Sequence, residues 1–300
     1  MNNFIKTVSL FIALLIGGLV TKTYAQDEPA KGLLYEVSGN GLKKPSYLFG
    51  TFHLLNSDFL NDMPKVAESF NKTKGLVVEV DLQPTDVLVV QQSMLMDGKK
   101  LSELFTKEEL DKLDGKLTEV MGFGIALFDN MKPAAIATVL AAAMPADVKA
   151  KIDKYKGTAM DMYFINEARA KNKTVTGLES LQEQVDILVG KPIDEQVVDL
   201  KKYIGKIDEA DTVTSKIVDL YFAQDLAGLW AVSADNKEFI GDMKRLLDDR
   251  NNAWMKKLPA LMKEKSQFIA VGALHLAGPV GLVYQLRKAG YTVTPIIDSK

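Results

Sequence analysis

The apolar positions of this chain form short runs of strand length near both ends and helical patterns in between. Short apolar runs bounded by polar residues are typical of buried strands, whereas apolar residues recurring about every 3.6 positions are typical of amphipathic helices. The strand-length runs cover residues 33–37, 47–49, 76–80, 174–178, 268–271 and 291–297. The clearest helical patterns cover residues 64–71, 107–121, 132–144, 160–171, 196–207 and 244–263.

This order of elements predicts an α/β fold with a central mixed sheet built from both ends of the chain and flanked by helices. The middle of the chain supplies two helical inserts, at about residues 83–155 and 181–265. No Ser/Gly/Pro-rich linker divides the chain, so we expect residues 26–300 to form a single domain.

The first 25 residues have the pattern of a secretory signal peptide. A short polar stretch with Lys6 precedes an apolar run, and Thr23-Tyr24-Ala25 provides a small-x-Ala cleavage site before Gln26. We therefore expect export to the periplasm or the exterior; the alternative is an uncleaved anchor, which Lys22 favours. The mature chain contains no predicted transmembrane segment, because its alanine-rich stretch at residues 134–143 is too short to span a bilayer.

Composition narrows the possible chemistry. The 300 residues include 37 Lys and Arg, 39 Asp and Glu, two histidines and no cysteine. Disulfides, zinc fingers, iron–sulfur clusters and thiolate nucleophiles are thereby excluded, and any metal must be held by His, Asp, Glu or neutral oxygen atoms. The net charge of −2 gives no indication of binding to nucleic acid or to an anionic membrane.

Both histidines occupy the same sequence element. Gly50-Thr51-Phe52-His53-Leu54 and Gly272-Ala273-Leu274-His275-Leu276 each follow a short apolar strand. With glycine at about 7% of residues, the chance that both histidines have glycine three positions earlier is on the order of 0.005. A glycine allows a sharp turn at the strand end and would deliver the imidazole to the carboxyl edge of the sheet, where α/β proteins bind ligands. The alternative is two separate, hydrogen-bonded core histidines.

Three further segments contribute polar candidates for the same site. Glu79 interrupts an apolar strand, with Asp81 two residues later on the same face; alternatively, this is an edge strand with Glu79 in solvent. Glu179 follows the strand at 174–178, where it would also suit a helix N-terminus. Arg250 and Asn251 lie in an amphipathic helix predicted over 245–261. An arginine in such a helix more often forms a surface salt bridge than binds a ligand.

These elements together resemble the TraB/PrgY/GumN family, which is related to the TIKI metalloproteases and more distantly to erythromycin esterases and ChaN-like haem-binding proteins. The matching residues are Gly50 to His53, Glu79, Gly177-Leu178-Glu179 with Gln184, Arg250-Asn251, the stretch from Val271 to Leu282, and Gly290 to Val293. The resemblance implies two related halves and a site formed by His53, Glu79 and His275. In the TIKI branch such a site hydrolyses peptide bonds with a divalent metal. Arg250, Asn251 and Glu179 match further recurring positions.

The leading hypothesis is an exported hydrolase that acts on a peptide or a small molecule and uses a divalent ion held by His53, His275 and Glu79. Mn, Fe, Co and Zn are not distinguished by such donors. The ion would activate water, Glu79 or Asp81 would take its proton, and Arg250 would stabilise the oxyanion. Whether Glu79 is ligand or base is left open.

Two alternatives remain at this point. In the first, hydrolysis needs no metal, and His53 is the general base with Glu79 orienting it. In the second, the protein binds haem or a peptide without turnover. The sequence does not determine the substrate or the oligomeric state.

Overall fold

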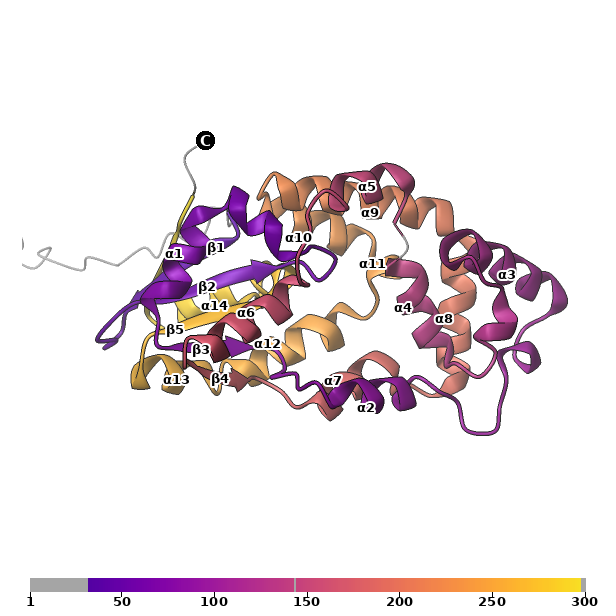
Figure 1. Ribbon diagram of the computed structural model, residues 1–300, viewed down its shortest axis with the longest axis horizontal. Coiled ribbons are helices and arrows are strands. Elements are labelled where there is room, and N and C mark those ends of the chain that lie inside the picture. The colour runs from indigo at the N-terminus through magenta and orange to yellow at the C-terminus, as the bar shows by residue number, and fades with distance from the viewer. Residues whose placement is uncertain (1–31, 143, 298–300) are drawn as a thin grey trace, which may run out of the picture.

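A six-stranded sheet lies at one end of the molecule and a group of helices at the other (Figure 1). The computed structural model describes residues 32–142 and 144–297. The predicted signal peptide at residues 1–25 and its cleavage before Gln26 lie outside the described residues.

The sheet has the strand order β4-β3-β5-β2-β1-β6. Its strands are β1 (Leu34–Gly39), β2 (Ser46–Thr51), β3 (Gly75–Val78), β4 (Thr174–Gly177), β5 (Gln267–Gly272) and β6 (Tyr291–Pro295). Strands β4, β3, β5 and β2 are parallel, whereas β1 is antiparallel to both β2 and β6. Each of the six predicted runs forms one strand, which confirms the α/β class and the mixed sheet built from both chain ends.

The helices fill the stretches between the strands. The α-helices are α1 (Pro64–Lys72), α2 (Asp86–Ser93), α3 (Lys107–Met121), α4 (Pro133–Ala142), α5 (Ala146–Ile152), α6 (Met160–Ala170), α7 (Leu181–Val189), α8 (Ile193–Gly205), α9 (Ile207–Phe222), α10 (Leu226–Asp235), α11 (Lys237–Ile240), α12 (Asp249–Trp254), α13 (Leu258–Glu264) and α14 (Leu282–Lys288). Shorter turns are the 3₁₀ segments η1 (Ser57–Asp62), η2 (Leu101–Glu103), η3 (Ile125–Leu127) and η5 (Ala273–His275), and the π-helical segment η4 (Lys244–Asp248).

The prediction of one continuous helix over residues 244–263 is wrong. The chain forms the π-helical η4, then α12, and after a turn a separate helix α13 with Pro259 in its first turn. Proline lacks the backbone N–H and its ring clashes with the carbonyl one turn earlier, so α12 cannot continue through this position. Periodicity alone does not register this break because the apolar pattern runs through it.

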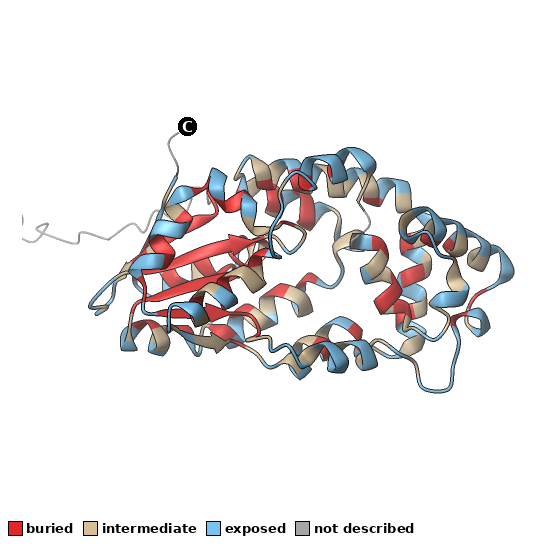
Figure 2. Ribbon diagram, viewed as in Figure 1, coloured by how far each residue is buried: buried red, intermediate tan, exposed pale blue. Residues whose placement is uncertain are grey.

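The sheet and the helices at its near end share one apolar core. All six residues of β2 and all four of β3 are buried, as are five of the six in β5, so the centre of the sheet is continuously buried (Figure 2). Helices α1 and α6 cover one face of the sheet, where Phe70 and Phe164 contact each other and both contact Phe268. Because these parallel strands are packed in the core, the residues that follow their carboxyl ends are held in fixed positions.

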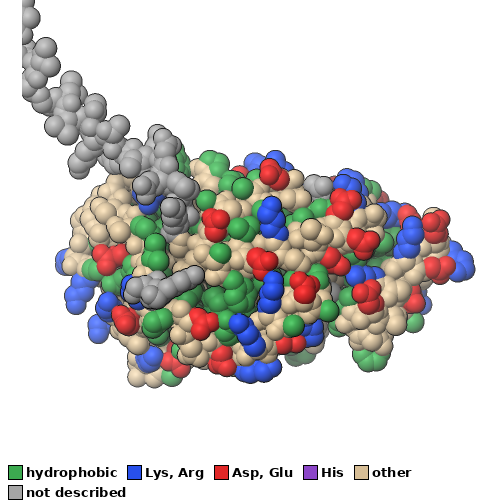
Figure 3. All heavy atoms as spheres, turned by 90° about the horizontal axis from the view of Figure 1, so that it is seen from above, with side chains coloured by type: hydrophobic (Ala, Val, Ile, Leu, Met, Phe, Trp, Pro, Cys, Tyr) green, Lys and Arg blue, Asp and Glu red, His purple; other side chains and the backbone are tan. Residues whose placement is uncertain are grey.

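A second apolar core lies in the helices at the far end. It is centred on Leu113 and Leu117 of α3, Ile136 and Leu140 of α4, and Leu200 of α8, all buried. The alanine-rich helix α4 is therefore part of a protein core. Within residues 32–142 and 144–297, no helix has the length and apolar character needed to cross a membrane. Basic and acidic side chains are interspersed over the face shown in Figure 3.

Candidate functional site

The two Gly-x-x-His elements lie side by side. Strands β2 and β5 are parallel neighbours, with Gly50 opposite Val271 and Thr51 opposite Gly272. A Cβ atom on Gly50 would lie 2.9 Å from the Cα atom of Ala273, so only glycine allows the turn after β5 to pack against β2. Both histidines consequently emerge at the carboxyl edge of the sheet, the edge that faces the helical end in Figure 1.

Gly272 lies where the three predicted site residues converge. A Cβ atom on Gly272 would be 3.3 Å from Glu79 Oε1, 3.6 Å from His53 Nε2 and 3.7 Å from His275 Cδ2. The absence of a side chain here leaves a small space bounded by a carboxylate and two imidazoles. We refer to this space beside Gly272 Cα as the Gly272 cradle.

Glu79 is a buried carboxylate, only 8% exposed, directly after β3. Because β3 lies between β4 and β5, the alternative of an edge strand with Glu79 in solvent is wrong. Glu79 Oε1 accepts from Gly272 N–H at 2.8 Å, and Oε2 accepts from Arg250 Nη2 at 2.5 Å. Burial raises the pKa of Glu79, but the neighbouring imidazoles, Arg250 and the Gly272 N–H outweigh it and lower the pKa to about 2.

His275 is a neutral imidazole whose tautomer is set by Asn251. The Asn251 amide nitrogen donates to the carbonyl oxygens of His275 and Val280, so its Oδ1 faces His275 Nδ1, 2.8 Å away, and accepts a hydrogen bond from it. His275 Nε2 is then an acceptor and receives a hydrogen bond from Arg250 Nη1 at 2.9 Å. Burial, together with the charge of Arg250, lowers the pKa of His275 to about 3 even though Glu79 opposes the change.

Arg250 connects the buried groups and is itself only 11% exposed. Its five N–H bonds are all used: Nε and Nη2 donate to Glu179, Nη2 also to Glu79, and Nη1 to Leu246 O and His275 Nε2. The prediction of a surface salt bridge is therefore wrong. In this arrangement no N–H of Arg250 is left to stabilise an oxyanion, and its observed role is to hold Glu79, Glu179 and His275 in place.

Glu179 accepts hydrogen bonds from Arg250 through both of its carboxylate oxygens. Besides Arg250, it accepts a hydrogen bond from Trp254 Nε1 at 3.3 Å, and Gln184 Nε2 lies 3.4 Å from both Glu179 Oε1 and Glu79 Oε2. The Trp254 ring also packs on the His275 imidazole, with ring centres 4.3 Å apart. Helix α12 thus contributes three residues to the site: Arg250, Asn251 and Trp254.

His53 has a partner that the sequence did not reveal. Its Nδ1 is 2.7 Å from Asp161 Oδ2, and Asp161 Oδ1 accepts from Thr51 Oγ1 at 2.7 Å. Asp161 lies in the first turn of α6, 108 positions from His53, and nothing in its local sequence distinguishes it from an ordinary helix N-terminal acid. Desolvation lowers the pKa of His53, but the hydrogen bond and charge of Asp161 and the charge of Glu79 raise it to about 9.

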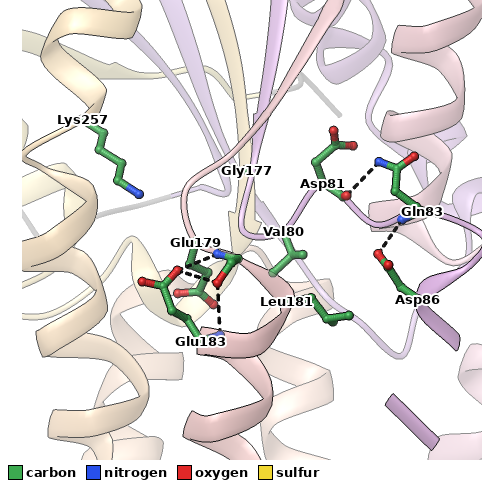
Figure 4. Close-up of a pocket in the computed structure, with 10 residues that line it drawn as sticks. Val80, Asp81, Gln83, Asp86, Gly177, Glu179, Leu181, Glu183 and Lys257 are labelled. Carbon is green, nitrogen blue, oxygen red and sulfur yellow. Dashed lines mark hydrogen bonds between the residues drawn. The ribbon is translucent and has the colours of Figure 1, made fainter. Parts of the chain in front are cut away.

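Asp81 does not join this cluster. Arg169 of α6 donates to Asp81 Oδ1 at 2.7 Å and also to Leu82 O. Asp81 lines a surface depression of about 550 Å³ beyond the ends of β3 and β4, with Lys257 on the opposite side (Figure 4). Of the cluster residues described above, only Glu179 lines this depression.

The predicted metal set of His53, Glu79 and His275 fits only in part. In both imidazoles Nδ1 is hydrogen-bonded to an oxygen atom, as is usual for metal-ligating histidines, and His53 Nε2 and Glu79 Oε1 face the cradle. His275 Nε2, however, already accepts a hydrogen bond from Arg250 Nη1 and is not available to a metal ion in this arrangement. Among residues 32–142 and 144–297, no three His, Asp or Glu side chains are arranged to hold a metal ion. A three-ligand site therefore requires a different position of Arg250.

The fold and this cluster define a class of α/β protein in which two strand–Gly-x-x-His elements meet at a buried carboxylate and guanidinium. The chain belongs to the TraB/PrgY/gumN family, whose model matches residues 33–295. This match confirms the resemblance noted in the sequence. No curated protein and no solved structure matches the chain.

Proposed function

We propose that this protein is a hydrolase in which His53 acts as general base at the Gly272 cradle. The observation that carries the proposal is the orientation of His53: Asp161 holds Nδ1, and Nε2 lies 3.6 Å from the point that a Cβ atom of Gly272 would occupy. A carboxylate that fixes one nitrogen of an imidazole leaves the other free to accept a proton. The imidazole is also accessible, with 65% of its side chain exposed.

The reaction begins from the neutral form of His53, which becomes the major form as the pH rises through its pKa of about 9. His53 Nε2 removes a proton from a water molecule in the cradle as the water oxygen attacks the carbonyl carbon of the substrate. The protonated His53 then returns that proton to the leaving nitrogen or oxygen as its bond to carbon breaks. Glu79, kept ionised, stabilises the imidazolium between these two steps. The products are a carboxylic acid and an amine or an alcohol.

We propose a peptide or a small ester as the substrate, acted on after export. Peptide-bond hydrolysis is the activity that the resemblance to the TIKI branch implies, and the predicted signal peptide is compatible with a substrate outside the cytoplasm.

A metal-dependent hydrolase is the second candidate, and one observation favours it. Both imidazoles have Nδ1 fixed by an oxygen acceptor, the arrangement that orients histidines toward a metal. A bound Mn²⁺, Fe²⁺, Co²⁺ or Zn²⁺ would supply Lewis-acid chemistry, with His53 and Glu79 as the two donors that already face the cradle.

The two candidates are distinguished by assaying the mature chain against peptide and ester libraries before and after exhaustive chelation. We expect hydrolysis that survives chelation and is lost in His53→Ala. Asp219→Asn, which removes an exposed carboxylate paired with Lys151, is the matched surface control and should be fully active. Activity lost on chelation and restored by one of these ions would select the metal-dependent candidate. Unchanged activity in His53→Ala would contradict both.

A further inference from the structure

Basic residues line the edge of the sheet at which most of its strands begin. Strands β4, β3, β5 and β2 are parallel, and β6 runs in their direction because β1 is antiparallel to both β2 and β6. These five strands begin at the end of the molecule away from the helical end, opposite to the Gly272 cradle (Figure 1). The four positions before each strand include two basic residues: Lys43 and Lys44, Lys72 and Lys74, Lys171 and Lys173, Lys263 and Lys265, and Arg287 and Lys288. We refer to these ten residues as the basic edge.

The ends of the neighbouring helices account for only part of this pattern. Helices α1, α6, α13 and α14 end just before β3, β4, β5 and β6, and basic residues stabilise the C-terminal end of a helix. Lys173 has such a role, because its Nζ donates to Phe70 O and Thr73 O at the end of α1. Lys43 and Lys44, however, lie in the turn between β1 and β2, where no helix ends. The pattern therefore follows the edge of the sheet rather than the helix ends.

The basic edge carries positive charge that the neighbouring residues do not neutralise. Glu264 is the one acidic residue among the positions that precede the five strands, and it pairs with Lys265 at 3.1 Å. Lys171 pairs with Glu167 at 2.8 Å. Six exposed lysines form no ion pair or side-chain hydrogen bond with another described residue: Lys43, Lys44, Lys72, Lys74, Lys263 and Lys288. Basic side chains project from this end of the molecule in Figure 3. The edge is therefore positive even though the chain has a net charge of −2.

We propose that the basic edge docks this protein on a membrane surface rich in anionic phospholipids. Six strands at a spacing of about 4.8 Å extend over about 24 Å, so the lysines form a row and do not converge on one point. Such a row matches a plane of phosphate groups, whereas a small anion requires donors that surround it. Each lysine close to an anionic membrane surface strengthens binding about fivefold.

Nucleic acid is a less suitable partner for this edge. None of the residues in the four positions before each strand is aromatic, so the edge offers no ring on which a base could stack. The predicted signal peptide also directs the chain out of the compartment that holds nucleic acid. A membrane surface is still accessible after export.

Docking through the basic edge leaves the candidate site accessible. Strand β2 has six residues with a rise of about 3.3 Å each, so His53 lies at least about 20 Å from the basic edge along the strand. The Gly272 cradle then faces away from the lipid (Figure 1). The inference concerns where the protein resides and goes beyond the proposed hydrolysis.

The test is sedimentation of the mature chain, residues 26–300, with lipid vesicles. The apolar run in residues 1–25 is left out because it would itself partition into lipid. We expect binding to vesicles of phosphatidylcholine mixed with phosphatidylglycerol and none to vesicles of phosphatidylcholine alone. Binding should be lost as NaCl is raised from about 50 mM to about 500 mM, because salt screens the interaction. The quadruple variant Lys43→Gln/Lys44→Gln/Lys72→Gln/Lys74→Gln should bind at least about tenfold more weakly than the native protein.

The matched control changes the net charge equally but leaves the basic edge intact. It replaces four exposed lysines that form no ion pair with a described residue: Lys99→Gln, Lys100→Gln, Lys202→Gln and Lys216→Gln. This variant should bind the mixed vesicles as the native protein does. Thermal unfolding of the native protein and both variants checks that each is folded.

Three results would overturn the proposal. If the native protein does not bind the mixed vesicles at low salt, it fails without reference to any variant. Equal weakening in the two quadruple variants would show that binding depends on total charge and not on the basic edge. Binding of the native protein to double-stranded DNA but not to the vesicles would identify nucleic acid as the partner instead. The assay contains no substrate, so a failure of the proposed hydrolase activity would be separate from a failure of this proposal.

Discussion

Replacing Asp161 by Asn tests whether the carboxylate sets the proton affinity of His53. The structure places a charged hydrogen bond of 2.7 Å between them, and the pKa of His53 is raised from 6.5 to about 9. Asp161→Asn removes the charge and, through its amide N–H, favours the His53 tautomer with the proton on Nε2. Because 65% of the His53 side chain is exposed, water screens part of the interaction, and we expect the pKa to fall by about one to two units, about 1.4 to 2.7 kcal/mol.

The assay is proton NMR of the imidazole C–H resonances, which is simple here because the chain has only two histidines. One resonance should titrate near pH 9 and move to lower pH in Asp161→Asn. The other, from His275, should not titrate between pH 5 and 10, because its pKa is about 3. Under the proposed mechanism the hydrolytic rate should rise with pH up to the pKa of His53, and Asp161→Asn should lower the maximal rate about 10²- to 10⁴-fold.

Stability gives an independent check with a defined sign. A histidine whose pKa is higher in the folded state stabilises the protein in full below its unfolded pKa of 6.5, and this stabilisation is lost as pH rises through about 9. The difference in unfolding free energy between native protein and Asp161→Asn should thus be larger at pH 6 than at pH 10. Asp219→Asn serves as control. A His53 resonance that titrates at the same pH in native protein and in Asp161→Asn would refute the reasoning.

Three further substitutions test other contacts. Gly272→Ala should reduce hydrolysis with little change in the unfolding midpoint, because its Cβ would fill the cradle 3.3 Å from Glu79 Oε1; an unchanged rate would contradict the position of the cradle. Gly50→Ala should cost about 1 to 3 kcal/mol in urea unfolding, because its Cβ would meet the Ala273 backbone at 2.9 Å; a neutral substitution would contradict the close packing. Tyr221→Phe should cost about 1 kcal/mol in the same assay, because Tyr221 Oη donates to Gly50 O at 2.9 Å, and should leave the hydrolytic rate close to native.

The sequence was most informative where the chain repeats itself. The two Gly-x-x-His elements predicted that His53 and His275 would reach one edge of the sheet, and β2 and β5 are indeed neighbours. The isolated acid Glu79 was recognisable because an acidic residue interrupts an apolar strand. The helix at residues 244–263 was less predictable, because its break depends on Pro259 and on a π-helical turn that the apolar pattern does not show.

Local sequence therefore determined the strands, the glycine turns and the identity of the residues at the sheet edge, because each of these depends on a few neighbouring side chains. Only the tertiary structure decided how those residues are paired. Asp161 is joined to His53 across 108 positions, and Arg250 is joined to Glu79 across 171. Such contacts form when α6 and α12 pack at the edge of the sheet, and they raise the pKa of His53 and lower that of His275.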